Sequence, residues 1–328
     1  MWIVPIACIA LHWGNLLKVT APVAGHCSAK VNSDVFAFGG LLPGGCTSQI
    51  RVFRDSKWQV LAPKHGSPTE RMYAASAAVD NEILMCGGWD PGDAGSGGVF
   101  FDDMWVFSPT DNQWRELTQR LPDGPASRHT LLSIGNSTVL IHTFSCNDHV
   151  LLYNHETETV ERLTTTGPSP ERLSMMSASW HPEAMTVVFS GGADKSRRMS
   201  TDVFLLDLRA WSWSKSRCST PTEDKPLSFA SASAVALPPT EHNIRQLVFG
   251  GGTVAASGEL CSSNALWIVD VNVAKRTHVW YRRFPSGVKP QSRVAARLDW
   301  VAPGIIMLHG GWKPETRVVH LFSHFLHL

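Results

Sequence analysis

Four arginines stand just before segments that we expect to form the first strand of a repeated unit. They are Arg71, Arg128, Arg172 and Arg293. A guanidinium group presents its N–H donors in a planar fork, which suits paired hydrogen bonds to a carboxylate. Four such groups around one opening would bind a carboxylate-bearing molecule or an acidic peptide. The alternative is structural, in which the arginines donate to backbone carbonyls or pair with a neighbouring unit.

A second set of residues suited to interfaces follows short apolar runs that end in paired glycines. The set is Trp89, Asp90, Asp194, Arg197, Trp312 and Lys313. Exposed Trp and Arg side chains are the ones that most often anchor protein interfaces. We therefore predict that these residues and the four arginines form one partner-binding surface, with a protein or peptide as the partner.

The chain shows no recognisable catalytic motif. The glycine-rich loop Gly92–Gly98 follows a predicted strand but opens no helix, and no Lys-Ser/Thr follows it, so it is not a phosphate-binding loop. A nucleophile elbow and a His-Glu-x-x-His motif are missing from the sequence. Glu70 and Glu171 alone make a weak acid–base pair. We expect no enzyme activity and no cofactor.

The histidines and cysteines do not predict a metal site. His26 and His129 each begin a first strand and approach the same opening, but two imidazoles with no third ligand make a weak site. His320, His324 and His327 have helical spacing on a predicted strand, where they cannot share one face. The seven cysteines show no Cys-x-x-Cys spacing. An odd number of scattered thiols favours a reducing, cytoplasmic location.

Composition and charge exclude several classes of partner. Hydrophobic residues make up 43% of the chain and charged residues 17%, which is typical of a compact globular protein. A formal net charge of +1 gives no electrostatic reason to expect nucleic acid or a membrane surface as a partner. The apolar stretch Trp2–Leu11 is shorter than the roughly 20 residues that span a bilayer. It also lacks the flanks of a secretory signal. We expect a monomer.

A unit of about 50 residues recurs along the chain. Its marker is a glycine pair after an apolar run, found at Gly39–Gly40, Gly87–Gly88, Gly191–Gly192, Gly250–Gly252 and Gly310–Gly311. The third copy is degenerate, because His142 and Thr143 stand where glycines are expected.

Each unit has the same internal order of four short strands, each bounded by turn residues. A strand of small residues comes first, then the apolar run with its glycine pair, then a bulky strand. A tryptophan in the fourth strand ends the unit, at Trp58, Trp114, Trp213 and Trp280, with Val160 in the degenerate copy. Four-stranded sheets repeated around an axis form a β-propeller. Small residues suit the crowded axis, and we expect the tryptophans to pack between blades.

The glycine pair, the bulky strand and the spaced tryptophan together resemble the kelch repeat, from about residue 11 to the end of the chain. The departures are the third unit and the scarcity of tyrosine. The resemblance implies an all-β, six-bladed propeller that binds a peptide or protein on one face. That face is formed by the loops before the first strands and the loops after the glycine pairs.

The ends of the chain predict how the ring closes. The last unit lacks its tryptophan strand, and residues 12–19 resemble that strand. We therefore predict blades at about 21–64, 65–122, 123–166, 167–222, 223–287, and 288–328 completed by 11–20, all in one domain spanning 1–328. The alternative is that Met1–Val4 adds a second N-terminal strand.

The favoured function is a non-catalytic adaptor or substrate-recognition module. One alternative is a propeller that binds a small molecule or sugar in its channel, as mutarotases of this architecture do. The other is a structural subunit of a cytoskeletal or trafficking complex.

Overall fold

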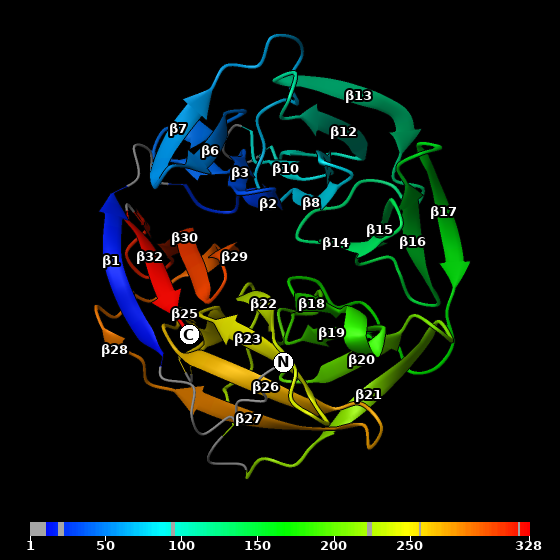
Figure 1. The fold of residues 1–328 in the computed structure, drawn as a ribbon, viewed down its shortest axis with the longest axis vertical. Coiled ribbons are helices and arrows are strands. Elements are labelled where there is room, and N and C mark those ends of the chain that lie inside the picture. Colours follow the sequence, from blue (N-terminus) through cyan, green and yellow to red (C-terminus); the bar gives the residue numbers. More distant parts are fainter. Residues whose placement is uncertain (1–10, 19–22, 93–95, 222–224, 256, 321) are drawn as a thin grey trace.

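The computed structural model describes residues 11–18, 23–92, 96–221, 225–255, 257–320 and 322–328. Viewed along its shortest axis, the chain forms a ring of small sheets (Figure 1). Residues of the first strands line a channel at its centre. Within the described residues six blades of four strands each make up the ring, which confirms the predicted all-β propeller.

The first three blades follow one another in sequence. Blade 1 is β2 (Cys27–Val31), β3 (Asp34–Phe38), β6 (Ile50–Arg54) and β7 (Lys57–Leu61). Blade 2 is β8 (Ala75–Val79), β9 (Glu82–Cys86), β12 (Asp103–Ser108) and β13 (Gln113–Arg120). Blade 3 is β14 (Thr130–Gly135), β15 (Thr138–His142), β16 (His149–Asn154) and β17 (Thr159–Thr164).

The remaining blades complete the circle. Blade 4 is β18 (Ser177–His181), β19 (Thr186–Ser190), β20 (Val203–Asp207) and β21 (Ser212–Cys218), with the short 3-10 helix η2 (Pro182–Ala184) in its first turn. Blade 5 is β22 (Ser233–Leu237), β23 (Ile244–Phe249), β26 (Leu266–Asn272) and β27 (Thr277–Arg283). Blade 6 is β29 (Val294–Ala302), β30 (Ile305–Lys313), β32 (Phe322–His327) and β1 (His12–Lys18).

The N-terminal strand β1 closes the ring. It pairs antiparallel with β32, and so supplies the fourth strand of the blade that the C-terminal strands begin. The predicted closure by one N-terminal strand is therefore confirmed. Met1–Val4, the alternative second strand, lies outside the described residues. Closure also covers the edge that β32 would otherwise expose to intermolecular pairing.

The innermost strands are joined by a closed circle of backbone hydrogen bonds. One residue at or just before the start of each first strand has a left-handed backbone, with φ between 52° and 65°. These residues are Gly25, Tyr73, Arg128, Met175, Ser231 and Ala295. Each donates its N–H to the carbonyl of its equivalent in the preceding blade, at 2.6–3.1 Å. The circle returns from Gly25 to Ala295, so it joins all six blades at the channel mouth.

The fourth-strand tryptophans pack between blades, as the sequence predicts. Trp114 of blade 2 lies against Phe38 of blade 1, with 5.1 Å between ring centroids. Trp213 of blade 4 lies against His142 of blade 3, and Trp13 of β1 lies against Phe249 of blade 5. Each is at most 5% exposed. Because each tryptophan removes a large apolar area from water, these contacts stabilise the ring.

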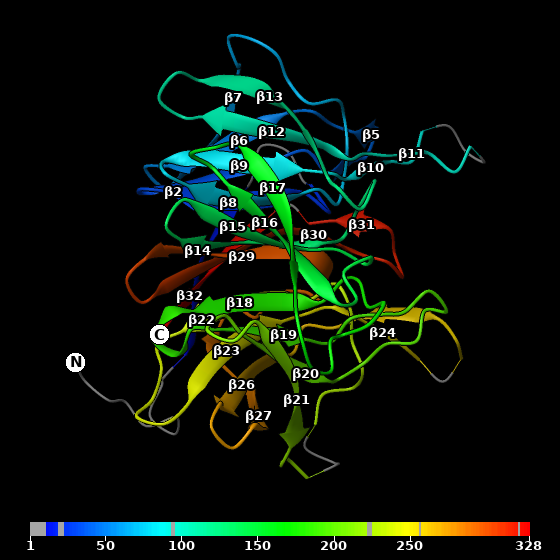
Figure 2. The same cartoon turned by 90° about the vertical axis from the view of Figure 1, so that its right-hand side faces the viewer.

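Short hairpins extend from the loops between second and third strands. They are β4–β5 (Leu41–Leu42, Gly45–Cys46), β10–β11 (Trp89–Asp90, Val99–Phe100) and β24–β25 (Gly252–Val254, Leu260–Ser262). In blade 6 the end of β30 pairs with β31 (Val318–Val319). Figure 2 shows that these elements project from one side of the ring.

Two parallel pairings join strands of neighbouring blades at the rim. β28 (Ser286–Gly287) pairs with β1, and β21 pairs with β27. The second pairing joins blades 4 and 5 into one sheet of eight strands. In the described part of the chain, helical structure is too short and too polar to cross a membrane.

Candidate functional site

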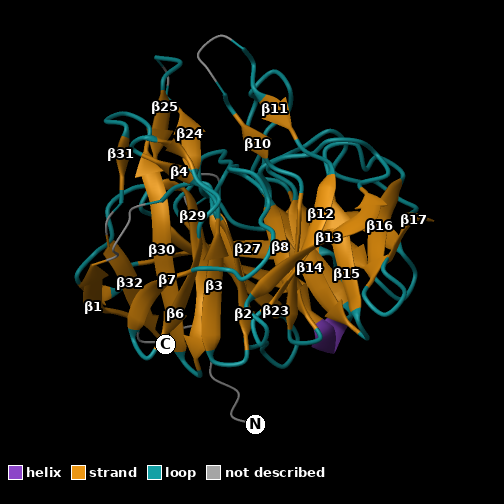
Figure 3. Cartoon of the chain, turned by 90° about the horizontal axis from the view of Figure 1, so that it is seen from above, coloured by secondary structure: helices purple, strands orange, loops and turns teal. Residues whose placement is uncertain are grey.

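Two sets of loops form one face of the ring, and we call it the hairpin face (Figure 3). The inter-blade loops lead into first strands, and the mid-blade loops follow the glycine pairs. Antiparallel pairing joins the two loops in five blades: Ala24 with Leu41, Met72 with Trp89, Ser174 with Ala193, Ala230 with Gly252, and Val294 with Trp312. The residues predicted to bind a partner therefore belong to loops that lie together.

Arg71 is buried inside blade 2, where it is 1% exposed. Its guanidinium pairs with the Asp103 carboxylate through two N–H groups, and its Nη1 also donates to the Gly87 carbonyl at 3.0 Å. Nη2 donates to Thr69 Oγ1, and the Phe101 ring stacks on the guanidinium at 3.8 Å. All of these partners lie within the fold, so Arg71 is not available at the surface as the sequence predicted.

Arg293 occupies the equivalent position in blade 6 and is also removed from that surface. It is 2% exposed, and its Nη1 donates to the carbonyl of Gly310, the first glycine of its own blade's pair. Nη2 lies 3.3 Å from His324 Nε2. Burial lowers the pKa of Arg293 to about 9, so the guanidinium remains charged at neutral pH. Arg71 and Arg293 therefore connect the inter-blade loop to the glycine pair.

Arg128 lies at the channel mouth. It is the left-handed residue of blade 3, two positions further along than Arg71 and Arg293 are in theirs. Its guanidinium stacks on the Tyr73 ring at 4.0 Å and lies 5.4 Å from the centroid of the Trp89 ring. The side chain is half-buried, and among the described residues no carboxylate forms an ion pair with it. The Arg128 guanidinium therefore lies against two aromatic rings and remains partly accessible as a charged hydrogen-bond donor.

Arg172 and Arg197 are exposed on the loops of blade 4. Arg197 has a left-handed backbone in the turn that begins at Asp194. Asp194 forms an ion pair with Arg198 at 2.8 Å, and hydrogen bonds from the Arg198 backbone and side chain lower the pKa of its carboxyl. Lys195 Nζ lies 5.1 Å from the Phe144 ring centroid. This part of the hairpin face is basic.

The two predicted tryptophans are half-buried in hairpins. Trp89 stacks on Phe100 across β10–β11, and its indole N–H donates to the Gly97 carbonyl at 3.2 Å. Asp90 accepts from the Gly92 backbone N–H and so shapes the same hairpin. Trp312 pairs with Val319 and is followed by half-buried Lys313. Both tryptophans support hairpins, and each keeps part of its ring accessible.

Exposed apolar side chains gather on the hairpin face. Its hairpins and inter-blade loops contribute Val99, Phe100, Leu227, Val254, Leu260, Val288 and Val318, each at least 40% exposed. On the turns of the opposite face, Met185 is the single large apolar side chain that is exposed among the described residues. Clustered exposed apolar surface marks interaction sites in soluble proteins. Sequence reasoning missed these residues because a valine or leucine in a loop carries no pattern.

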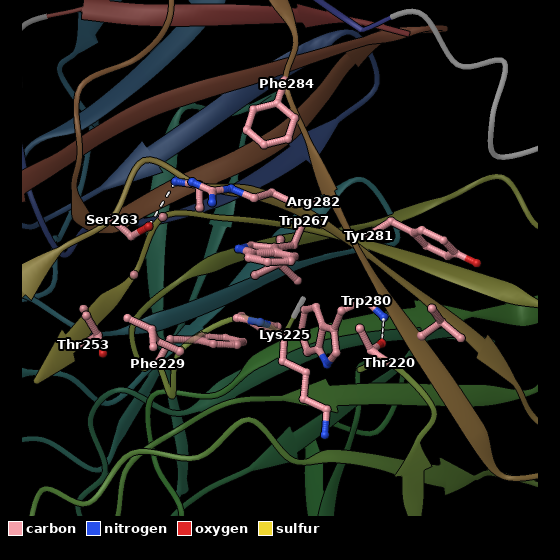
Figure 4. A pocket seen from close by; sticks show the side chains of 18 of the residues that line it. Thr220, Lys225, Phe229, Thr253, Ser263, Trp267, Trp280, Tyr281, Arg282 and Phe284 are labelled. Carbon is pink, nitrogen blue, oxygen red and sulfur yellow. Dashed lines mark hydrogen bonds between the residues drawn. The ribbon is translucent and has the colours of Figure 1, made fainter. Parts of the chain in front are cut away.

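A cavity of about 640 Å³ lies beside blade 5, between the inter-blade loop and strands β26 and β27 (Figure 4). Trp267 and Trp280 form part of its wall, edge to face at 6.2 Å. The Arg282 guanidinium lies over the Trp267 and Phe284 rings. Phe284 is 76% exposed at the rim. An aromatic cavity of this size with two cations in its lining, Lys225 and Arg282, fits an apolar side chain or small ligand that carries an anionic group.

The central channel contains two hydrogen-bonded histidine groups. His26 and His129 do line its mouth. His26 Nε2 lies 3.1 Å from His309 Nδ1, and His309 Nε2 lies 2.7 Å from Asp299 Oδ2. His129 Nε2 lies 3.4 Å from Cys86 Sγ.

Burial sets the protonation of these groups. It lowers the pKa of His26 well below its usual range and that of His129 to about 3, and it raises the pKa of the Cys86 thiol. The Cys86–His129 pair is therefore a neutral thiol beside a neutral imidazole, which is unreactive. Glu70 and Glu171, the glutamates considered for acid–base chemistry, are exposed and lie outside the channel lining.

The fold and its loop face define a kelch-type β-propeller. A family model described as the KLHDC2/KLHL20/DRC7 Kelch-repeats domain matches residues 129–325, and a kelch motif model matches residues 70–119. The chain therefore belongs to the kelch-repeat family. It is also similar to a solved structure titled "Structure of YjhT", with a TM-score of 0.68 and 18% identity over 93% of this chain and 95% of that chain. That likeness supports the fold.

Proposed function

We propose that the chain is a non-catalytic binding module that holds a protein or peptide on its hairpin face. The observation that carries the proposal is the one-sided distribution of exposed apolar side chains. Hairpins and loops of several blades contribute them to the hairpin face, whereas Met185 is the single large apolar side chain that is exposed on the described turns of the opposite face. Interfaces combine such apolar anchors with a polar rim.

Charge specifies the partner further. Arg128 at the channel mouth and Arg172 and Arg197 on the inter-blade and mid-blade loops present guanidinium groups on the same face as the exposed apolar side chains. A peptide with apolar side chains and acidic groups, or a free carboxylate, complements this surface. We propose the same partner class that the arginines indicate in the sequence, now with Arg71 and Arg293 excluded from direct contact.

The absence of catalysis is part of the proposal. Its support is the lowered pKa of His26 and His129 at the channel mouth, because a general acid or base needs a pKa near the working pH. A cytoplasmic location is supported by the free state of the described cysteines. A monomeric state is proposed with it.

Arg128→Ala combined with Arg172→Ala and Arg197→Ala is expected to weaken partner binding at least about tenfold, since interface arginines are frequent hot spots. Ala295 already occupies the left-handed position equivalent to Arg128, so alanine is accommodated there. The measurement is quantitative affinity purification with mass spectrometry of wild-type and variant baits. Titration calorimetry with the recovered partner then gives the dissociation constants.

A matched variant separates this face from charge loss in general. Lys275→Ala and Arg209→Ala remove cations from the turns of the opposite face, where both residues are exposed. Binding is expected to be unchanged in that variant, and circular dichroism should match for all three proteins. Partner loss in the Lys275/Arg209 variant, with retention in the triple-arginine variant, would contradict the proposal.

A further inference from the structure

Blade 3 departs from the repeat at the point where its mid-blade loop begins. His142 and Thr143 replace the glycine pair, and residues 143–148 form turns between β15 and β16 instead of a hairpin. Three side chains with metal-ligating atoms meet there: Asp123 from the inter-blade loop, Cys146 from the mid-blade loop and His149 at the start of β16. In five other blades a backbone pairing joins these two loops. In blade 3 contacts among these three side chains connect the two loops.

The ligand atoms are spaced for one ion. Asp123 Oδ2, Cys146 Sγ and His149 Nε2 all lie within 4.8 Å of one another. Cys146 Sγ lies 3.8 Å from Asp123 Oδ2, and His149 Nε2 lies 2.8 Å from the same oxygen. Bonds of about 2.0–2.3 Å in a tetrahedral zinc site separate neighbouring ligand atoms by about 3.3–3.8 Å. The Asp123–Cys146 distance matches that spacing, and the Asp123–His149 distance is about half an ångström shorter than it.

Surrounding groups hold each ligand in the orientation that an ion requires. His149 Nδ1 lies 3.0 Å from Asp148 Oδ1, which directs Nε2 toward the cluster. Arg162 Nε donates to Asp123 Oδ1 at 2.7 Å, so Oδ2 is the oxygen that faces the other two ligands. The Thr143 backbone N–H donates to Cys146 Sγ at 3.3 Å. Carboxylate–histidine pairs and second contacts of this kind are characteristic of metal sites in proteins.

The burial of the cluster is that of a built site. Cys146 is 1% exposed, and the side chains of Asp123 and His149 are 7% and 15% exposed. Such burial keeps the three groups in place and leaves one side open to solvent. A fourth position remains for water or for a group from a bound partner.

We propose that Asp123, Cys146 and His149 bind one Zn²⁺ ion on the hairpin face of blade 3. Imidazole, thiolate and carboxylate together match the borderline softness of zinc better than that of calcium or magnesium. Binding replaces the Nε2 proton of His149 and the Sγ proton of Cys146 with bonds to the ion. Both protons pass to solvent, and the oxidation states of metal and sulfur do not change.

The same contacts also describe a simple ion-pair network, in which an imidazolium bridges Asp123 and Asp148 while Arg162 balances the charge. The two descriptions differ in what happens when metal is added. In the ion-pair network the imidazolium and Arg162 balance the two carboxylates, so no stoichiometric metal uptake is expected. The zinc site takes up one equivalent and binds it through the Cys146 sulfur, which in the ion-pair network only donates a weak hydrogen bond to Asp123.

Metal uptake by the full-length chain tests the proposal. Titration with Zn²⁺ against a chromophoric chelator is expected to show one equivalent bound with a micromolar or lower dissociation constant. Titration with Co²⁺ should give the d–d bands of a tetrahedral site and a thiolate charge-transfer band. His149→Gln and Cys146→Ser should each weaken binding at least about tenfold, since they remove a direct ligand.

Control variants show whether Cys146 supplies the sulfur ligand, and a measurement on the unmutated chain keeps the test valid if a ligand variant misfolds. Cys218→Ser combined with Cys261→Ser should keep the cobalt spectrum, and so should His242→Gln, which changes an exposed histidine elsewhere. X-ray absorption on the unmutated zinc-loaded chain should show one sulfur ligand, even if a ligand variant fails to fold. The proposal is overturned if no stoichiometric uptake occurs, if no sulfur ligand is seen, or if folded ligand variants bind zinc as tightly as the wild type. Partner binding by the hairpin face is untouched by that result.

Discussion

Replacing Arg71 with methionine is expected to lower the free energy of unfolding by about 3–5 kcal/mol. The side chain is buried, and its loss leaves the Asp103 carboxylate, with 12% of its side chain exposed, without its cation. The Gly87 carbonyl also loses its donor. A buried charge that loses its partner is far more destabilising than the pair itself is stabilising. The measurement is urea unfolding followed by tryptophan fluorescence and circular dichroism.

The same position in blade 6 supplies the matched control. Arg293 donates to Gly310 as Arg71 donates to Gly87, but its other partners are the Gln291 carbonyl and His324, with no carboxylate. Arg293→Met should therefore cost about 1–3 kcal/mol, the range for losing hydrogen bonds to buried acceptors. Adding Asp103→Leu to Arg71→Met should recover part of the loss. If the two single variants unfold at the same urea concentration, the uncompensated carboxylate is not the cause.

The features of the fold that could be predicted from the sequence are those at positions with little room for a different side chain. The glycine pairs mark the repeat because a side chain cannot fit there: a Cβ on Gly87 would lie 2.4 Å from the Ala126 carbonyl oxygen, and φ is 62°. The fourth-strand tryptophans are equally constrained by the space between blades. Such positions tolerate few residue types, so blade number, strand order and ring closure could all be predicted.

The roles of individual arginines could not be predicted, because a shift of two residues changes which side of the loop a side chain occupies. Arg71 lies two residues before the left-handed residue Tyr73 and points into its blade, whereas Arg128 is itself the left-handed residue and lies over Tyr73. The sequence analysis assigned both arginines to the same position, just before a first strand. Only the circle of backbone hydrogen bonds fixes the true alignment between blades.

The cluster in blade 3 was missed for a related reason. Asp123 precedes the first strand of the blade, and Cys146 follows the second, so no local spacing joins them. Each is unremarkable in sequence. In five blades a backbone pairing joins the inter-blade and mid-blade loops. In the degenerate blade 3, side-chain contacts join them instead.

Acid should destabilise the fold well before its carboxylates titrate. Burial lowers the pKa of one set of histidines from the usual value of 6.5, to about 3 for His129 and to about 4 for most others. The set is His26, His129, His181, His278, His320 and His324. In the unfolded chain they titrate near pH 6.5. Folding therefore favours the neutral imidazoles. Their contribution to the free energy of unfolding is complete above pH 6.5 and is lost as the pH falls toward 4.

The expected slope follows from proton linkage. Between pH 6 and 5 the unfolded chain binds several more protons than the folded chain, and each extra proton lowers the unfolding free energy by about 1.4 kcal/mol per pH unit. Urea unfolding at pH 7.5, 6.0, 5.5 and 5.0 gives the unfolding free energy as a function of pH. We expect its slope between pH 6 and 5 to correspond to at least about three protons. His149 has the opposite effect on the slope. Burial lowers its pKa, but hydrogen bonds to Asp148 and Asp123 outweigh burial and raise the pKa overall. It is one histidine against six.

One buried histidine and one exposed histidine separate this cause from general charging. His278 Nδ1 lies 2.9 Å from Ser216 Oγ inside the paired rims of blades 4 and 5, where it is 2% exposed. His278→Gln should reduce the slope by about one proton, because the group that must be desolvated is gone. His242→Gln, on the surface, should leave the slope unchanged. A flat profile from pH 7.5 to 5.0 would mean that the imidazoles are protonated inside the fold, and burial would then not control their charge.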